Sequence, residues 1–239
     1  MSEQLDRVID AAKNGRVDEV SSLLDADPTL ATAATMAGAQ LIHAAYFAGQ
    51  TAVIELLFQR GVTLDPYLAA DLGMLDKVKA ATEADPDFPG EFGPNGFTAL
   101  HRACYWGQAD VARFLLDEGT DPNAITQDKF LQIAPLGCAV ATADVPNPSD
   151  DEDAVLELVQ LLVERGAKVN ARRRDGLTAL HSAAFRGHLK VIRYLLDHGA
   201  DPAMRGYDAL GSSHSGKLPA DFAAAHGHTN AVEMLKAKA

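Results

Sequence analysis

The chain has 239 residues, of which 47% are hydrophobic and 23% charged, and its formal net charge is −12. This composition is that of a folded protein and argues against disorder over most of the length. The negative charge disfavours sequence-independent binding to DNA or to anionic lipid, because such binding needs cations on the protein. The first residues include three acidic side chains where a signal peptide needs basic ones, and no apolar run reaches about 18 residues. With only two cysteines, which suits a reducing compartment, we expect a cytoplasmic protein without a membrane span.

An internal repeat dominates the sequence. Residues 98–107 read TALHRACYWG, and residues 178–187 read TALHSAAFRG. Weaker copies can be aligned on the final glycine or its equivalent, and they end at Gly15, Gly49, Gly73, Ala143 and Gly227. Apolar segments follow the strongest copies, at 111–116 and 191–196. Self-similarity at this spacing predicts a repeat architecture.

Each repeat carries the signals of two short helices. Thr98 and Thr178 stand where a helix N-cap needs a hydroxyl group, and Pro135 and Pro219 suit the first helical position. The repeat glycines suit a left-handed helix end. A unit of two antiparallel helices and an extended loop cannot bury its apolar face alone, so consecutive units are expected to stack.

The pattern resembles the ankyrin repeat, and it is identified as a stand-alone, bacterial-type member of that family. The resemblance implies an all-α fold: an ankyrin-repeat solenoid of about seven stacked helix-turn-helix repeats with projecting hairpin loops. We expect a single domain over residues 1–239, with the first and last repeats acting as caps. The approximate repeats are 1–34, 35–65, 66–93, 94–126, 127–173, 174–206 and 207–239.

Three segments depart from the repeat. Gly49 and Gly73 are too close in sequence for a full repeat, so Asp65-Pro66 should lead directly into a helix and one projecting loop should be missing. An acidic insertion at 144–153 is interpreted as a solvated loop rather than a cation site, and Ser149-x-x-Glu152 within it reads as a capping box. The enlarged loop 204–218 nearly matches a phosphate-binding loop. Leu218 stands, however, where that motif needs Ser or Thr, so a flexible loop is the better interpretation.

No residue pattern predicts catalysis, a metal site or a cofactor. His43, His101 and His181 occupy the repeat's own histidine position, where a structural role is expected. Cys104 and Cys138 fall on the first helices of neighbouring repeats, at packing positions. We therefore expect neither catalytic nor metal-binding residues, and no cofactor.

The resemblance implies that the concave face, built from the first helices and the loops, is the recognition surface. The two positions before each repeat glycine are expected on that face, and they include aromatic residues and arginines, which are enriched in binding hot spots. The alternative is that these rings pack beneath neighbouring loops as part of the core. The predicted partner-binding residues are Phe47, Arg102, Tyr105, Trp106, Arg172, Arg173, Arg174, Phe185 and Arg186.

Charge is unevenly distributed. Residues 1–93 carry six Lys or Arg against fifteen Asp or Glu, whereas residues 94–239 carry fifteen against eighteen. Three adjacent arginines at 172–174 are either a solvated loop tip or a site for an acidic or phosphorylated segment.

The predicted function is non-catalytic protein–protein recognition by a monomer through its aromatic and arginine-lined concave face, without nucleic acid or membrane. The alternative is a small-molecule-binding protein or enzyme with a pocket near Trp106 and the irregular fifth repeat. A deep enclosed cavity with convergent polar groups would favour the alternative, and an open surface would favour the first function.

Overall fold

The computed structural model describes residues 2–33, 40–141, 151–207 and 215–238. Within these residues the regular structure is helical, and the β-structure is limited to isolated bridge positions, among which Phe92 and Thr98 pair in an antiparallel bridge. The predicted all-α fold is therefore confirmed. The chain divides into two compact units, Met1–Leu68 and Ala69–Ala239. The expectation of one domain over 1–239 remains a prediction.

The first unit contains two helix pairs. In each pair the helices pack on one another, and α1 packs on α3 while α2 packs on α4. The helices are α1 (Ser2–Lys13), α2 (Val17–Ala26), α3 (Leu41–Phe47) and α4 (Thr51–Gln59), with a 3₁₀ turn, η1, at Pro28–Ala31.

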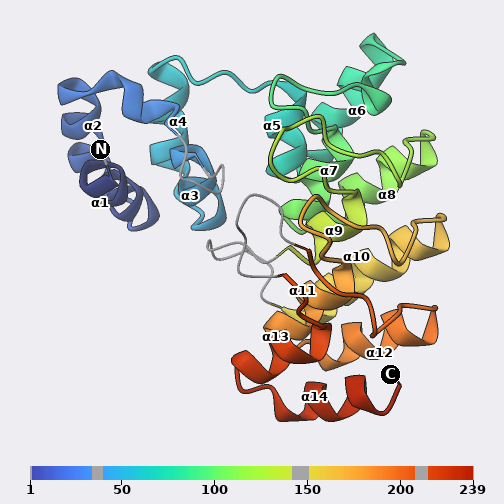
Figure 1. The fold of residues 1–239 in the computed structure, drawn as a ribbon. Coiled ribbons are helices and arrows are strands. Elements are labelled where there is room, and N and C mark those ends of the chain that lie inside the picture. Colours follow the sequence, from blue (N-terminus) through green and yellow to red (C-terminus); the bar gives the residue numbers. More distant parts are fainter. Residues whose placement is uncertain (1, 34–39, 142–150, 208–214, 239) are drawn as a thin grey trace. The chain divides into compact units, whose positions relative to one another are not determined.

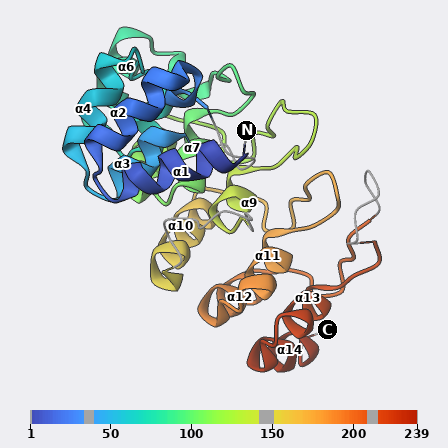
Figure 2. The ribbon, with the colours of Figure 1, turned by 90° about the vertical axis from the view of Figure 1, so that its left-hand side faces the viewer.

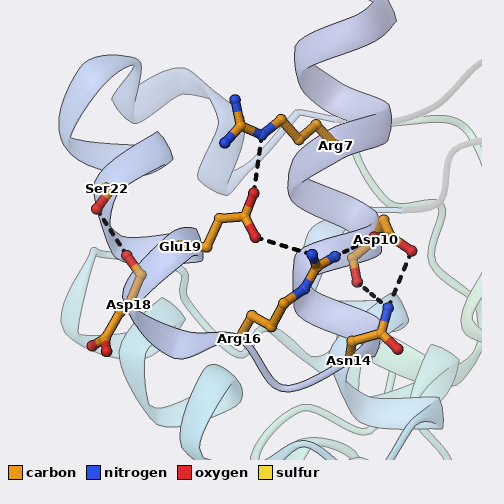
Figure 3. Close-up of polar contacts among 7 residues, drawn as sticks. All are labelled: Arg7, Asp10, Asn14, Arg16, Asp18, Glu19 and Ser22. Carbon is orange, nitrogen blue, oxygen red and sulfur yellow. Dashed lines mark hydrogen bonds and ion pairs between the residues drawn. The ribbon is translucent and has the colours of Figure 1, made fainter.

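A polar network covers one side of the first helix pair (Figure 3). Glu19 accepts a hydrogen bond from Arg7 Nε at 2.9 Å and forms an ion pair with Arg16 at 3.1 Å. Arg16 also pairs with Asp10, whose carboxylate accepts a bond from Asn14. These side chains are largely solvent-exposed, so the network contributes little to stability.

The second unit is a stack of helix pairs in which each pair packs on the next (Figure 1). Its first helices α7, α9, α11 and α13 form one layer, and its second helices α8, α10, α12 and α14 form another. The helices are α5 (Pro66–Asp71, which begins in the first unit), α6 (Leu75–Ala84), α7 (Ala99–Tyr105), α8 (Ala109–Asp117), α9 (Pro135–Ala139), α10 (Glu152–Glu164), α11 (Ala179–Arg186), α12 (Leu189–Asp197), α13 (Pro219–Ala225) and α14 (Thr229–Lys236), with a 3₁₀ turn, η2, at Phe88–Gly90. None of the described helices is both long and apolar enough to cross a membrane.

The predicted helix signals are present. Thr98 caps α7, and its hydroxyl accepts a bond from the His101 N–H at 3.4 Å. Pro135 and Pro219 open α9 and α13. Asp65 leads directly into α5, as the short spacing predicts, and its carboxylate accepts the Leu68 N–H at 2.7 Å.

The repeat histidine joins a helix to the next projecting loop. His101 Nδ1 accepts the Thr98 N–H at 3.3 Å, so the ring proton resides on Nε2. Nε2 then donates to the carbonyl oxygens of Ala124 and Ile133, at 3.0 and 3.1 Å. Burial lowers the pKa of His101 to about 4, which keeps the ring neutral. The predicted structural role of this histidine is confirmed by these bonds.

A second recurring bond joins neighbouring helix pairs. The donor is the side chain of the residue that follows one repeat glycine. The acceptor is the backbone carbonyl oxygen of the residue two positions before the glycine of the preceding repeat. The bonds run from Gln50 to Lys13 at 3.1 Å, from Gln108 to Asp71 at 3.0 Å and from His228 to Phe185 at 3.0 Å. Each such side chain also lies against the earlier glycine, where a Cβ atom would meet it at 2.2–2.5 Å.

One predicted cap is not the one that the structure uses. Helix α10 begins at Glu152, and Asp151, rather than Ser149, is its N-cap and accepts the Asp153 N–H at 3.0 Å. Asp and Ser are equally good N-caps, so local preference could not choose between them. Ser149 lies outside the described residues, as do most of the acidic insertion 144–153 and the middle of the loop 204–218.

Candidate functional site

The ends of the first helices in the second unit carry most of the predicted binding residues. Arg102 of α7 reaches back to Asp71 at the end of α5, and its Nε donates to Asp71 Oδ1 at 2.7 Å while Nη2 bonds the other carboxylate oxygen. The Asp71 side chain is 1% exposed and that of Arg102 is 22% exposed. Such a two-point pair fixes the guanidinium plane while leaving one edge accessible.

Tyr105 and Trp106 follow Arg102 on the same helix. Their rings meet edge to face with centroids 5.3 Å apart. Trp106 is only 8% exposed, whereas Tyr105 is half-buried. Burial raises the pKa of Tyr105 to about 12, so the phenol is neutral at physiological pH. Of the two predicted anchors, Tyr105 is therefore the one with an accessible ring.

Two further predicted residues end α11. Arg186 is partly buried, and its Nη2 donates to the Ala141 carbonyl oxygen at 3.0 Å. The Phe185 ring lies 4.0 Å, centroid to centroid, from that of His226 in the following repeat. Both side chains thus contact neighbouring helix pairs and keep part of their surface exposed.

Phe47 is the one predicted residue in the first unit. Its backbone ends α3, but its side chain lies outside the described part of the structure.

The three loop arginines bind their own and neighbouring loops. Arg172 donates to the carbonyl oxygens of Gly176 and Arg205, at 3.1 and 2.9 Å. Arg173 forms a two-point pair with Asp175, at 2.6 and 2.7 Å. Arg174 bonds the Lys129 carbonyl oxygen. All three arginines are intermediate in exposure, so they are ordered parts of the loop surface.

Two hollows border the fifth repeat: a small cavity, and a larger, partly open one of about 280 Å³ whose lining includes Gly107, Gln108 and Glu157. Cys104 and Cys138 are both buried, and burial raises the pKa of each thiol, which keeps them protonated and poorly nucleophilic. A cavity of about 10 Å³ lies between α9 and α11, lined by residues that include Leu136 and Ser182, and it has room for about one water molecule. No cluster of three metal-ligating side chains occurs in the described ranges.

The sequence interpretation missed three residues that bear on binding. Asp71 is buried beneath Arg102, and only the fold brings the two residues together. Phe130 and Tyr207 are 75% and 47% exposed on projecting loops. The sequence feature that could have indicated Phe130 and Tyr207 is an aromatic residue within a polar loop: Phe130 follows Asp128-Lys129, and Tyr207 follows Arg205-Gly206.

Comparison with known proteins agrees with this architecture. The sequence model of ankyrin repeats (three copies) matches residues 8–126 and 152–239. The chain is 38% identical to the B-cell lymphoma 3 protein homolog of Mus musculus over 110 residues, and these cover 46% of the chain and 22% of that protein. It is 36% identical to ankyrin repeat domain-containing protein 63 of Homo sapiens over 129 residues, which cover 54% of the chain and 30% of that protein.

A third relative carries an enzyme's name. The chain is 31% identical to the serine/threonine-protein kinase TNNI3K of Mus musculus over 119 residues, which cover 49% of the chain and 13% of the kinase. The chain thus spans under a third of the length of each of these three relatives. The family model, by contrast, matches most of the chain, in the helix pairs described above. The chain belongs to the ankyrin-repeat family.

Proposed function

We propose that this chain is a non-catalytic protein-binding module whose partner contacts the first-helix ends of the second unit. We define this first-helix surface by Arg102, Tyr105, Phe185 and Arg186. The observation that carries the proposal is that Arg102, Phe185 and Arg186 are held by neighbouring repeats, and Tyr105 by the adjacent Trp106 ring, while all four keep accessible surface. Side chains already fixed before binding lose less entropy when a partner arrives.

The residue types support a protein as the partner. Tyrosine and arginine are enriched among the residues that dominate binding energy at protein interfaces. The two arginines favour an acidic or phosphorylated segment, because a guanidinium group bonds such oxygens at two points. The small-molecule alternative has less support, since the enclosed cavity beside the fifth repeat has room for about one water molecule and the hollow of about 280 Å³ beside Gln108 and Glu157 is partly open to solvent.

Kinetic binding measurements test the proposal. A partner obtained by affinity purification and confirmed by direct binding should bind Tyr105→Ala more weakly by about 2 kcal/mol or more, as at a hot spot. Tyr194→Ala is the matched control, because Tyr194 lies on the second helix α12 and is also only partly buried. Normal binding by folded Tyr105→Ala and Arg186→Ala variants would place the interface elsewhere.

A further inference from the structure

The projecting loops of the second unit form a second continuous surface. We define the loop-tip surface by residues 125–132, 172–176, 205–207 and 215–217. Backbone hydrogen bonds join consecutive loops: the Arg174 N–H donates to the Leu131 carbonyl oxygen at 3.0 Å, and the Tyr207 N–H donates to that of Asp175 at 2.9 Å. These loops extend to the same side of the helix stack (Figure 2). The surface therefore has a defined geometry across three repeats.

A carboxylate arranges the first loop around an exposed ring. Asp128 accepts the backbone N–H groups of Phe130 and Leu131, at 2.8 and 2.6 Å, and the Thr126 hydroxyl at 2.5 Å. With its backbone fixed in this way, the loop presents Phe130 at 75% exposure and Leu131 at 44%. Large apolar side chains that stay this exposed on a protruding loop are typical of contact surfaces.

A second exposed ring is fixed on the third loop. The Tyr207 ring lies against Gly176, where a Cβ atom would approach it to 2.5 Å. The Arg172 guanidinium lies 5.4 Å from the ring centroid, within the range of a cation–π interaction. Tyr207 is nevertheless 47% exposed, so much of its surface remains available to a partner.

The loop-tip surface is basic in an acidic protein. By sequence its segments, extended through the whole of 205–217, carry six Lys or Arg against three Asp, whereas the whole chain has a net charge of −12. Two of the three carboxylates are already engaged: that of Asp128 by backbone N–H groups and that of Asp175 by Arg173. The exposed cations are Lys129, Arg205 and Lys217, and they flank the two exposed rings along the chain.

We propose that the loop-tip surface binds an acidic peptide segment that carries an apolar side chain. The apolar side chain packs on Phe130, Leu131 and Tyr207, and the carboxylates face Lys129 and Arg205. A short acidic peptide meets mainly these local cations, whereas a long nucleic acid also meets the field of a chain with net charge −12. This inference specifies the partner of the proposed protein-binding function and therefore rests on it.

Selection from phage-displayed random peptides of about twelve residues tests the proposal on the full chain. Selected peptides should be rich in Asp and Glu around an aliphatic or aromatic residue. Their synthetic copies should bind at least about tenfold more weakly to Phe130→Ala and to Arg205→Glu, the second loss being larger at low salt. The matched controls are Tyr194→Ala and Lys77→Glu, which change a ring on α12 and an exposed cation on α6. Circular dichroism and the unfolding midpoint verify the fold of each variant.

Each other outcome has a separate meaning. Selected peptides without acidic enrichment, or peptides that bind both loop variants normally, overturn the loop-tip proposal. If those peptides instead depend on Tyr105, the loop-tip proposal fails while the first-helix surface stands. Tighter binding of a single-stranded oligonucleotide than of any selected peptide, lost in Phe130→Ala, would assign the surface to nucleic acid and overturn the proposal.

Discussion

Burial separates residues that look alike in the sequence. Tyr105 and Trp106 are adjacent aromatic residues, and both were expected on an exposed face. In the structure Trp106, the C-cap of α7, is 8% exposed, while Tyr105, whose ring meets it edge to face, is half-buried. Trp106 therefore contributes to the core, and Tyr105 remains the candidate contact residue.

Replacing Trp106 should destabilise the protein rather than only weaken binding. Trp106→Ala removes a nearly buried ring, and such truncations lower the free energy of unfolding by about 3–5 kcal/mol. Denaturant titration followed by circular dichroism measures this change, with Tyr105→Ala as the milder neighbouring variant. A fully stable Trp106→Ala protein would show that the ring is dispensable for packing.

The buried repeat histidines should make stability depend on pH. Burial lowers the pKa of His101 and of His181 to about 4, from a usual value of 6.5. Between these values the unfolded chain binds a proton that the folded protein does not, so stability falls as pH drops from about 6.5 toward 4. Protonation of each histidine in the unfolded chain should lower the free energy of unfolding by about 2 kcal/mol at pH 5 relative to pH 7.5.

Thermal unfolding at pH 7.5 and pH 5 checks this pH dependence. His101→Gln should be less stable at pH 7.5 and should lose less stability on acidification than the wild type. His198→Gln is the control variant, because His198 is an exposed histidine at the C-terminal end of α12 and lies outside the buried core. An equal acid-induced loss in wild type and His101→Gln would assign the pH dependence to other groups.

Helices in neighbouring repeats are joined at their glycine ends. Gly187 ends α11 at φ 70°, a left-handed conformation that costs a side-chain-bearing residue free energy. The His228 ring of the next repeat lies against this glycine, and a Cβ atom there would meet the ring at 2.5 Å. Gly227 has the same position in the next repeat, with φ 76° and nothing described within 4 Å of such a Cβ atom.

Substitutions at these two glycines distinguish the free-energy cost of the left-handed backbone from the cost of the steric contact with His228. Gly227→Ala should lower the free energy of unfolding by about 1–2 kcal/mol, the cost of the left-handed conformation alone. Gly187→Ala should cost more, because it also displaces His228 from its bond to the Phe185 carbonyl oxygen. Urea titration of both variants gives the difference. Equal losses would mean that the His228 ring moves aside without cost.

At the scale of the whole molecule, stability should be a sum over neighbouring helix pairs. In the second unit each pair packs on the next, as shown by the contacts of α11 with α13 and of α12 with α14. Such a protein has no single central core, so removing a terminal pair exposes the apolar face of its neighbour without abolishing the rest of the stack.

Deletion of residues 207–239 tests this additivity. The truncated protein lacks α13 and α14, which cover α11 and α12 in the full chain. We expect a lower unfolding midpoint and lower solubility, with the helix content of the remaining pairs largely kept. Calorimetry, circular dichroism and light scattering measure these properties. An unchanged midpoint in a monodisperse monomer would show that the last pair does not act as a cap.

The sequence by itself determined the local elements and their order. Thr98, Pro135 and the repeat glycines specify where helices begin and end, because caps and left-handed ends depend on residues within one turn of the chain. The repeated spacing then predicts stacked helix pairs. Predictions were weaker where the repeat was interrupted: the N-cap of α10 is Asp151 rather than Ser149.

Only the tertiary structure decided which side chains are buried, paired or exposed. Asp71 and Arg102 lie 31 positions apart, and the burial of their pair depends on how α5 and α7 approach. The loop that presents Phe130 is likewise joined to the loops of other repeats, through the bonds of Gln127 N–H to Gly96 and of Arg174 N–H to Leu131. A repeat pattern specifies each unit, but the surface of the stack arises where units meet, and those contacts join residues that are distant in sequence.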